Sequence, residues 1–290
     1  ASGKPAFLVS NRQGTGADSR VIAATREGFP VVDGVMPFLR CAKLLLDHRD
    51  FLARDREAPG PLPKNALAGW RTRLAGGGNL DENDAMNLLR DFGLPANPGR
   101  IVANEVEARG AAREFGYPVV LKTAVPGIDH KSDRNGVHLG IGDEAALIAG
   151  YRDLATRIGP RALVAPMVTA EGVEMLLGMI HDGQFGPVVL VGFGGLHVEA
   201  LADVVHALPP FDAAEAARLI DRLALAPLLK SRRHRRAPAV DEFCRTAAKF
   251  SGMVAGLGDL LAEIDLNPVI VHADGCVIVD ALVVTKARNA

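Results

Sequence analysis

A stretch dense in proline and glycine, residues 55–78, constrains how this 290-residue chain can fold. It contains Ala-Pro-Gly-Pro-Leu-Pro at 58–63, the only tryptophan, Trp70, and the triple glycine Gly76–Gly78. Proline and glycine density without apolar periodicity is typical of a linker. The sequence therefore predicts a linker between a first domain, 1–54, and a second, 79–290. A phosphate-binding role for the three glycines is less favoured, because no strand precedes them.

The first domain has the pattern of alternating strands and helices. Residues 6–10 and 29–32 are apolar and favour strands, while 19–28 and 34–54 carry helical patterns. This is one and a half βα units, which is too little to bury both faces of a parallel sheet. The pattern predicts the C-terminal part of a doubly wound domain whose beginning is not in this sequence.

The second domain mixes helices with β-hairpins. Asp81 is a good N-cap for a helix that ends at Gly93. Strands are predicted at 100–102, 119–122, 136–141, 163–168, 174–179 and 188–193, and helices at 104–115, 143–157, 211–223 and 240–257. A final hairpin pairs 263–271 with 276–284 across a turn at 273–275. The mixture predicts an α/β protein with a two-subdomain α+β nucleotide-binding architecture.

Composition narrows the class of protein. The formal net charge is −1, which gives no reason to expect binding to nucleic acid or to a membrane surface. No apolar run reaches membrane-spanning length. The three cysteines, Cys41, Cys244 and Cys276, are far apart and odd in number, so reduced thiols in a cytoplasmic protein are expected.

The segment 118–137, PVVLKTAVPGIDHKSDRNGV, is the first candidate site. Lys122 ends a short apolar run, and Gly127 and Gly136 would let backbone N–H groups approach an anion. This pattern indicates a phosphate-binding loop. An ordinary hairpin with a solvated lysine is the alternative, because the segment is neither a Walker A motif nor GxGxxG.

The second candidate is an acidic cluster near the end of the chain. In a strand, residues two apart face the same side, so Asp265 and Asn267 present two oxygens to one point. Asp280, on the adjacent strand of the hairpin, can reach the same place. Hard oxygen ligands of this kind suit Mg²⁺, which predicts a metal site. The alternative is a surface hairpin with a polar face.

Three further segments carry weaker signals. The segment 165–174 ends one strand and starts another, so its backbone could hold an adenine edge and Glu174 a ribose; taken alone, an edge strand and a turn are favoured. Phe185-Gly186-Pro187 and the glycines of 192–195, with Glu199 nearby, permit close approach to an anion, although a structural turn is equally plausible. The basic run 230–236, KSRRHRR, favours a loop facing phosphate or CoA, or simply a solvated loop.

Together these segments resemble the nucleoside-diphosphate-forming acyl-CoA synthetases, the acetate–CoA ligase (ADP-forming) group related to succinyl-CoA synthetase. The resemblance covers residues 79–284 and corresponds to the ATP-grasp domain of that family. It is carried, in order, by VVLK at 119–122, HKSD at 130–133, GV at 136–137, FGP at 185–187, GFGG at 192–195 and EIDLNP at 263–268. Residues 1–54 resemble the end of the family's flavodoxin-like CoA-ligase region.

The resemblance implies ATP and Mg²⁺ as cofactors. It implies synthesis of an acyl-CoA from a carboxylic acid, CoA and ATP, with release of ADP and phosphate. The ATP phosphates would be bound by Lys122 and Lys131, and His130 would take part in phosphoryl relay. The adenine and ribose would be held by Pro166, Met167, Val168 and Glu174, and the metal by Asp265, Asn267 and Asp280.

The resemblance also implies what this chain lacks. The family's CoA-binding domain and its principal phosphohistidine lie N-terminal to this region or on a separate chain. We therefore expect the chain to bind Mg-ATP, to require a CoA-binding domain or subunit for acyl-CoA synthesis, and to act in an oligomer. Asn135 stands where the family commonly has glycine, and Ala165 where glutamine is frequent, so nucleotide preference stays open. A carboxylate–amine ligase of another ATP-grasp branch and a non-catalytic nucleotide-binding module are the alternatives.

Overall fold

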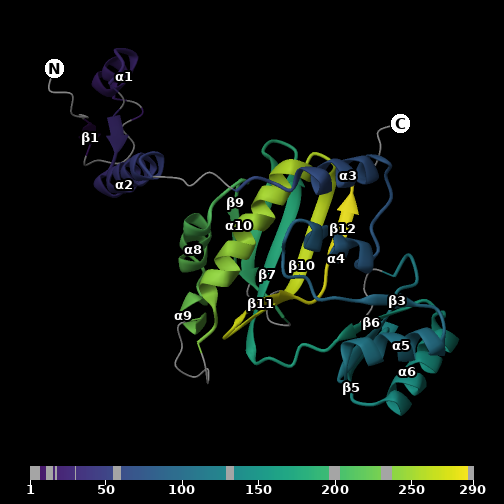
Figure 1. The fold of residues 1–290 in the computed structure, drawn as a ribbon. Coiled ribbons are helices and arrows are strands. Elements are labelled where there is room, and N and C mark those ends of the chain that lie inside the picture. Colours follow the sequence, from purple (N-terminus) through teal and green to yellow (C-terminus); the bar gives the residue numbers. More distant parts are fainter. Residues whose placement is uncertain are drawn as a thin grey trace. The chain divides into compact units, whose positions relative to one another are not determined.

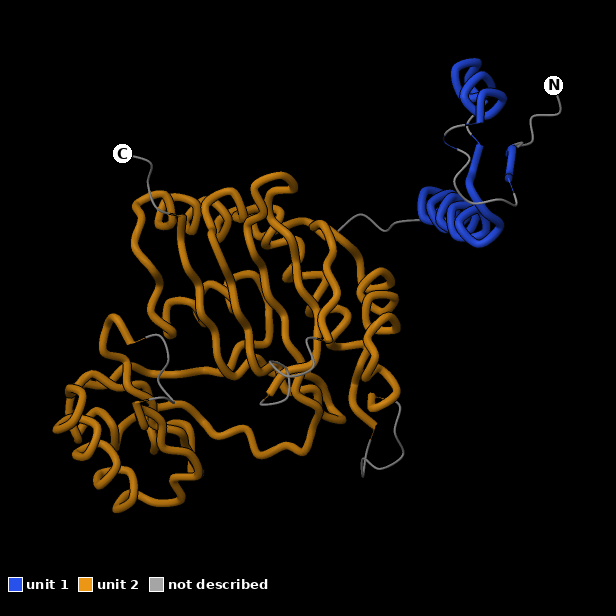
Figure 2. Tube along the Cα trace, turned by 180° about the vertical axis from the view of Figure 1, so that it is seen from behind, with its two compact units in different colours: residues 1–56 blue, residues 57–290 orange. Residues whose placement is uncertain are grey.

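The computed structural model describes residues 7–10, 16, 18–29, 31–54, 60–128, 134–195, 203–229 and 237–286. The chain forms two compact units, residues 1–56 and residues 57–290 (Figure 2). Several predicted site residues lie outside the described ranges: His130, Lys131, Glu199 and the basic run 230–236. None of the helices in the described ranges has the length and apolar character needed to cross a membrane.

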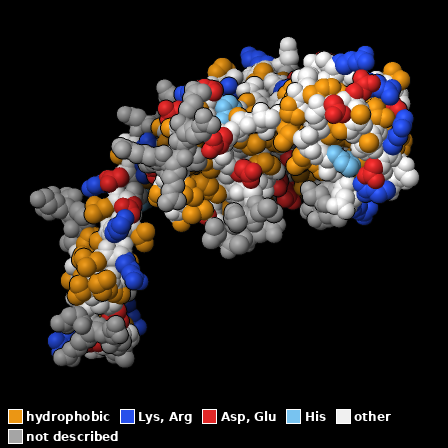
Figure 3. Space-filling view, turned by 90° about the horizontal axis from the view of Figure 1, so that it is seen from below, with side chains coloured by type: hydrophobic (Ala, Val, Ile, Leu, Met, Phe, Trp, Pro, Cys, Tyr) orange, Lys and Arg blue, Asp and Glu red, His pale blue; other side chains and the backbone are white. Residues whose placement is uncertain are grey.

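Unit 1 is a small βαβα arrangement, and its elements are those that the sequence predicts. Strands β1 (Leu8–Ser10) and β2 (Val31–Asp33) pair in parallel, and helices α1 (Ser19–Arg26) and α2 (Val35–Leu52) follow them. Among its described residues only Gly34 is buried. Figure 3 shows hydrophobic side chains gathered on the surface of unit 1, at the lower left. The described residues of unit 1 therefore form two strands and two helices, and they bury no apolar side chain.

The larger sheet of unit 2 has six strands. These are β7 (Gly172–Asp182), β8 (Gly186–Phe193), β9 (Val204–Ala207), β10 (Leu261–His272), β11 (Gly275–Ile278) and β12 (Leu282–Thr285). Their order is β11-β10-β7-β8-β9, and β12 also pairs with β10. Since β7 occupies one edge of β10 along most of its length, β11 and β12 share the other edge.

Helices cover one face of this sheet. Figure 1 shows α8 (Ala213–Asp221) and α10 (Val240–Leu257) lying across it, with the short α9 (Ala226–Leu229) at one end. The core contains Phe243, Phe250 and Met253 of α10 together with Leu177 and Met179 of β7. Side chains alternate along a strand, so the residues between the buried ones face the opposite side. That opposite side carries Glu174, Asp265 and Asn267, and Figure 2 shows its strands from behind.

The smaller sheet of unit 2 is antiparallel, with order β3-β6-β4-β5. It contains β3 (Arg100–Val102), β4 (Val119–Thr123), β5 (Val137–Ile141) and β6 (Ala162–Pro166). Helices α5 (Glu105–Phe115) and α6 (Glu144–Arg157) pack against it and form a second core (Figure 1). Both begin with a side-chain cap: Asn104 accepts from the N–H of Glu107, and Asp143 accepts from the N–H of Ala146. Unit 2 thus has the two predicted subdomains.

The prediction of a linker over residues 55–78 is wrong for half of that segment. Helix α3 (Lys64–Ala75) lies within it and precedes α4 (Glu82–Asp91). Trp70 and Leu74 are buried in the larger core, and the indole Nε1 of Trp70 donates to Asp91 at 2.8 Å. The proline and glycines flank this helix rather than interrupt it, since Pro63 is its N-cap and Gly76 its C-cap. Composition averaged over 55–78 therefore hid a short helix.

Two other expectations differ in detail. Strand β6 ends at Pro166, so Met167 and Val168 follow it instead of belonging to it. The final hairpin is formed by β10 and β11 as predicted, but it stops at Ile278, and β12 pairs separately with the first half of β10. The interruption is residues 279–281, which include Asp280.

Candidate functional site

Lys122 is the cation around which the candidate site is built. It lies on β4, where every residue is buried, and its own exposed fraction is 6%. Its Nζ donates to Glu82 Oε1 at 2.6 Å and to the carbonyl of Val279 at 3.2 Å, and lies 3.3 Å from Asp280 Oδ2. Burial lowers the pKa of Lys122, but the Asp280 and Glu82 carboxylates together outweigh burial and leave the pKa raised. The ammonium group therefore stays charged.

Asp280 reaches Lys122 because the edge of the larger sheet is interrupted. The register pairs Val269 with Ile278 and Asp265 with Leu282, which puts Asp280 opposite Asn267. The break leaves Asp280 outside both ladders, where its Oδ1 accepts from the N–H of Ala281 at 2.9 Å. Its side chain is 41% exposed, so it can face a ligand as well as Lys122.

Asp265, Asn267 and Asp280 line one cavity of about 480 Å³. The Val125–Ile128 loop after β4 also lines it, and so does the start of α4 with Glu82. Burial, followed by the nearby Glu263 and Asp280 carboxylates, raises the pKa of Asp265 to about 6. A carboxylate in that environment gains from a cation. The sequence prediction that these three side chains meet is consistent with this cavity.

The donor set fits a hard divalent cation. Two carboxylates and one amide oxygen are the ligands that Mg²⁺ or Ca²⁺ takes from proteins, with water and phosphate completing the shell. The described ranges contain no group of three or more His, Cys, Asp and Glu residues that could hold a metal, at this site or at any other. The third protein ligand would accordingly be the amide of Asn267, whose Oδ1 accepts from the N–H of Gly195 at 3.3 Å.

The glycine turn after β8 packs directly against the site. The Gly194 N–H donates to the Glu174 carbonyl at 2.8 Å, and a Cβ at Gly194 would approach Asn267 Oδ1 to 3.0 Å. Gly195 has a φ of +83°, and a side chain there would collide with the Glu174 carboxylate. The two glycines are therefore required by the packing of Glu174 and Asn267, and Glu174 itself is exposed.

The segment predicted to hold adenine has fewer available backbone groups than expected. The carbonyl of Pro166 accepts from Asn97 Nδ2 at 2.9 Å, and the N–H of Met167 donates to the carbonyl of Pro118 at 3.0 Å. The Pro166 carbonyl keeps a second lone pair, whereas the Met167 N–H is used within the protein. Contacts of Pro166, Met167 and Val168 with adenine stay a prediction.

Sequence reasoning missed two buried polar residues, Glu82 and Asn97. Glu82 is the first residue of α4, where an acid is already explained by the helix dipole, and its partner Lys122 is 40 residues away. Asn97 lies in the connection from α4 to β3 and joins the two sheets: its N–H bonds to Ile278 of β11 and its amide to Pro166 of β6. Glu82 stands in a polar run, Asp81–Asp84, and therefore gave no signal, whereas Asn97 is a single polar residue among prolines, glycine and apolar residues.

Unit 2 therefore has two sheets, and a lysine of the smaller one pairs with Asp280 at the edge of the larger one, beside a cavity that three oxygen-bearing side chains line. This arrangement defines the ATP-grasp class, and the family described as the ATP-grasp domain matches residues 71–285. Given that match and the relatives described below, the chain belongs to the ATP-grasp family of ADP-forming acyl-CoA ligases.

The relatives differ in length. The chain is 33% identical over 233 residues to the β subunit of acetate–CoA ligase [ADP-forming] II from Pyrococcus furiosus, which covers 77% of this chain and 96% of that subunit. It is 37% identical over 224 residues to trans-feruloyl-CoA synthase FCS1 of an unknown prokaryotic organism, covering 72% of this chain but 31% of that protein. The chain thus spans nearly all of a separate subunit and about a third of a single-chain relative.

A solved structure shares the fold. The dinucleotide-forming acetyl-coenzyme A synthetase 1 of Ca. Korarchaeum cryptofilum, in complex with coenzyme A and Mg-AMPPCP, superposes with a TM-score of 0.66 at 30% identity. The match covers 75% of this chain and 97% of that one. That protein binds a magnesium complex of an ATP analogue.

Proposed function

We propose that this chain is the ATP-binding, phosphoryl-transfer part of an acid–CoA ligase that forms acyl-CoA, ADP and phosphate. The observation that carries the proposal is the cavity lined by Asp265, Asn267 and Asp280, with the buried Lys122 ammonium group 3.3 Å from Asp280. A buried cation beside oxygen ligands for a divalent ion is what a polyphosphate needs for binding. The names of the relatives supply the reaction class.

In this proposal ATP lies between the two sheets. Asp265, Asn267 and Asp280 would hold Mg²⁺, which would neutralise charge on the phosphate oxygens. Lys122 supplies a fixed positive charge from the smaller sheet, and the Val125–Ile128 loop closes the cavity over the phosphates. The base would lie along Pro166–Val168, and the ribose hydroxyls would donate to Glu174.

His130 is proposed to take part in phosphoryl relay, with Lys131 as a second phosphate contact. Both lie outside the described residues, so their roles rest on the resemblance of HKSD at 130–133. A neutral imidazole is a competent phosphoryl acceptor. The carboxylic acid and CoA would be bound by a CoA-binding domain or subunit, with the whole enzyme as an oligomer.

Binding and reconstitution test the proposal. Calorimetric titration with Mg-ATP is expected to show binding by wild-type and by Lys249→Met, an exposed control whose Nζ contacts only a backbone carbonyl among the described residues, and to fail for Lys122→Met. Adding a CoA-binding subunit from a related ligase is then expected to give acid- and CoA-dependent release of ADP. ADP release that depends on an amine instead of CoA would support a carboxylate–amine ligase, and binding without turnover under any condition a non-catalytic module.

A further inference from the structure

The ammonium group of Lys122 is already fully hydrogen-bonded within the protein, before any phosphate binds. An ammonium group has three N–H donors, and Nζ of Lys122 has three oxygen acceptors within 3.3 Å: Glu82, Val279 and Asp280. A phosphate oxygen can reach this ammonium group only if one acceptor withdraws. Which acceptor withdraws decides how the site responds to its ligand.

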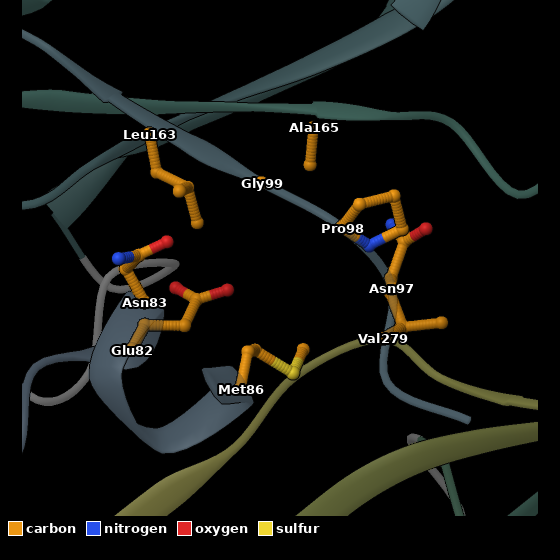
Figure 4. Close-up of a pocket in the computed structure, with 9 residues that line it drawn as sticks. All are labelled: Glu82, Asn83, Met86, Asn97, Pro98, Gly99, Leu163, Ala165 and Val279. Atoms are coloured by element: carbon orange, nitrogen blue, oxygen red, sulfur yellow. The ribbon is translucent and has the colours of Figure 1, made fainter. Parts of the chain in front are cut away.

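The two carboxylates are held very differently. Glu82 is 2.6 Å from Nζ with a side chain 5% exposed, whereas Asp280 is 3.3 Å away and 41% exposed. Figure 4 shows the Glu82 carboxylate pointing into a small cavity of about 10 Å³. Met86, Leu163, Ala165 and Val279 are among the residues that line it, and it has room for no more than about one water. Glu82 also borders the larger cavity, but its short and almost fully buried contact holds it against Lys122, whereas the more exposed Asp280 side chain can turn towards that cavity.

The start of α4 adds a second constraint on Glu82. The preceding residue, Asp81, caps the helix by accepting from the N–H of Asp84 at 2.8 Å, and it also pairs with Arg161 Nη2 at 2.8 Å. Arg161 in turn donates to the carbonyl of Ala124, just beyond β4. The helix end that carries Glu82 is therefore fixed to the same subdomain as Lys122.

From these contacts we infer that Glu82 is a positioning residue that keeps Lys122 in place while Asp280 passes from Lys122 to a divalent cation. The exchange rests on the proposed function. When a cation–polyphosphate complex binds, Asp280 turns from the ammonium group to the cation. The released N–H then donates to a phosphate oxygen, and the Glu82 pair is kept.

The charges make this exchange depend on the cation. Without a divalent ion, polyphosphate must displace Asp280 from Lys122 and then lie beside the carboxylates of Asp265 and Asp280. With the ion, the same two carboxylates become ligands. Glu82 strengthens the dependence on the cation, because its negative charge compensates the positive charge of Lys122. A polyphosphate without a metal is therefore attracted only weakly to this lysine. The chain therefore selects the metal complex of the nucleotide over the free nucleotide.

The test compares nucleotide affinity with and without metal. The probe is an ATP analogue with a methylene bridge between the β and γ phosphorus atoms, titrated calorimetrically in Mg²⁺ or in EDTA. In Glu82→Gln the free analogue is expected to bind more tightly and the magnesium complex more weakly. The ratio of the two dissociation constants should fall about tenfold, as expected for a typical coupling between two ligands. Glu242→Gln, which neutralises an exposed glutamate paired with Arg245, should leave the ratio unchanged.

A purely structural role for Glu82 gives a different result. If both affinities weaken by the same factor, or if the ratio is unchanged, Glu82 does not position Lys122 for the exchange and the inference is wrong. Should Glu82→Gln not fold, as judged by circular dichroism, Glu82→Asp replaces it. That variant keeps the charge but draws it back, and the ratio should fall by a smaller factor. If wild-type protein does not bind the magnesium complex at all, the proposed function fails and the exchange fails with it.

Discussion

Lys122 and Glu82 form an ion pair that is almost fully buried. Removing one partner of such a pair destabilises the folded protein strongly, because the other charge is left buried without compensation. We expect Lys122→Met to reduce the free energy of unfolding by about 3 kcal/mol, because the variant removes the cation beside a buried carboxylate. Urea unfolding of the metal-free protein measures this. The double variant Lys122→Met/Glu82→Gln should recover part of the loss, since the buried negative charge is gone. A loss below about 1 kcal/mol in the single variant would contradict this account.

The raised pKa of Asp265 predicts how the stability of the protein depends on pH. Its pKa is raised to about 6 from 3.8, so the folded protein binds its proton more strongly than the unfolded chain does. The resulting penalty is fully present above about pH 6 and is relieved as the pH falls through 6 towards 4. In metal-free protein, Asp265→Asn should therefore raise the free energy of unfolding at pH 8. After allowance for solvent screening, the gain should be about 1 kcal/mol.

The pH series of thermal or urea unfolding checks the sign. The advantage of Asp265→Asn should shrink as the pH falls from 7 to 5 and vanish near pH 4. An advantage that instead grows at low pH would show that the carboxylate is stabilising in the folded state. The same variant should bind Mg-ATP more weakly, because it loses one anionic ligand.

At the scale of elements, the sequence was most informative where structure is local. Helices α4, α5 and α6 are capped by Asp81, Asn104 and Asp143, and in each case the capping side chain and its N–H partner are three residues apart. Asn135 shows the same principle in a turn. It has a φ of +49°, which asparagine tolerates better than other residues with side chains, so it can take a turn position that otherwise favours glycine.

Contacts between residues far apart in the sequence could not be predicted from local sequence patterns. Asp265, Asn267 and Asp280 were grouped from strand alternation, but the break between β11 and β12 that aims Asp280 depends on the register with β10. The Lys122–Glu82 contact joins two elements whose separate sequences both look ordinary. Helix α3 was missed because its apolar residues find their partners in the larger core and not along the chain.

Helix α3 can be tested directly. Trp70→Ala should lower the free energy of unfolding by about 3 kcal/mol, because it removes a buried ring and the hydrogen bond to Asp91. Thr72→Ala on the exposed side of the same helix is the control, expected to change stability by less than about 0.5 kcal/mol. Chemical denaturation of both variants decides the matter. Equal, small effects would mean that residues 64–75 behave as a linker after all.

At the scale of the whole molecule, the two units differ in what they bury. Unit 2 contains both hydrophobic cores, whereas in unit 1 the described large apolar side chains are exposed or half-buried, including Leu44, Leu46 and Leu52. A polypeptide of 1–56 should therefore show no cooperative thermal transition by circular dichroism, and one of 57–290 should show a single sharp one. A sigmoidal melt of 1–56 alone at low concentration would contradict this. The assignment of residues 1–54 as the end of a flavodoxin-like domain stays a prediction.

The interruption at 279–281 has a consequence for solubility as well as for binding. The edge strand of a sheet is a template on which other chains can add and aggregate, and short edge strands reduce that risk. Here the outer edge beside β10 is divided into two four-residue strands, β11 and β12, with a carboxylate between them. A continuous strand of that length would offer an unbroken row of N–H and C=O groups to another molecule. The interruption at 279–281, which places Asp280 at the cavity, thus also reduces the tendency of the sheet edge to pair with another molecule.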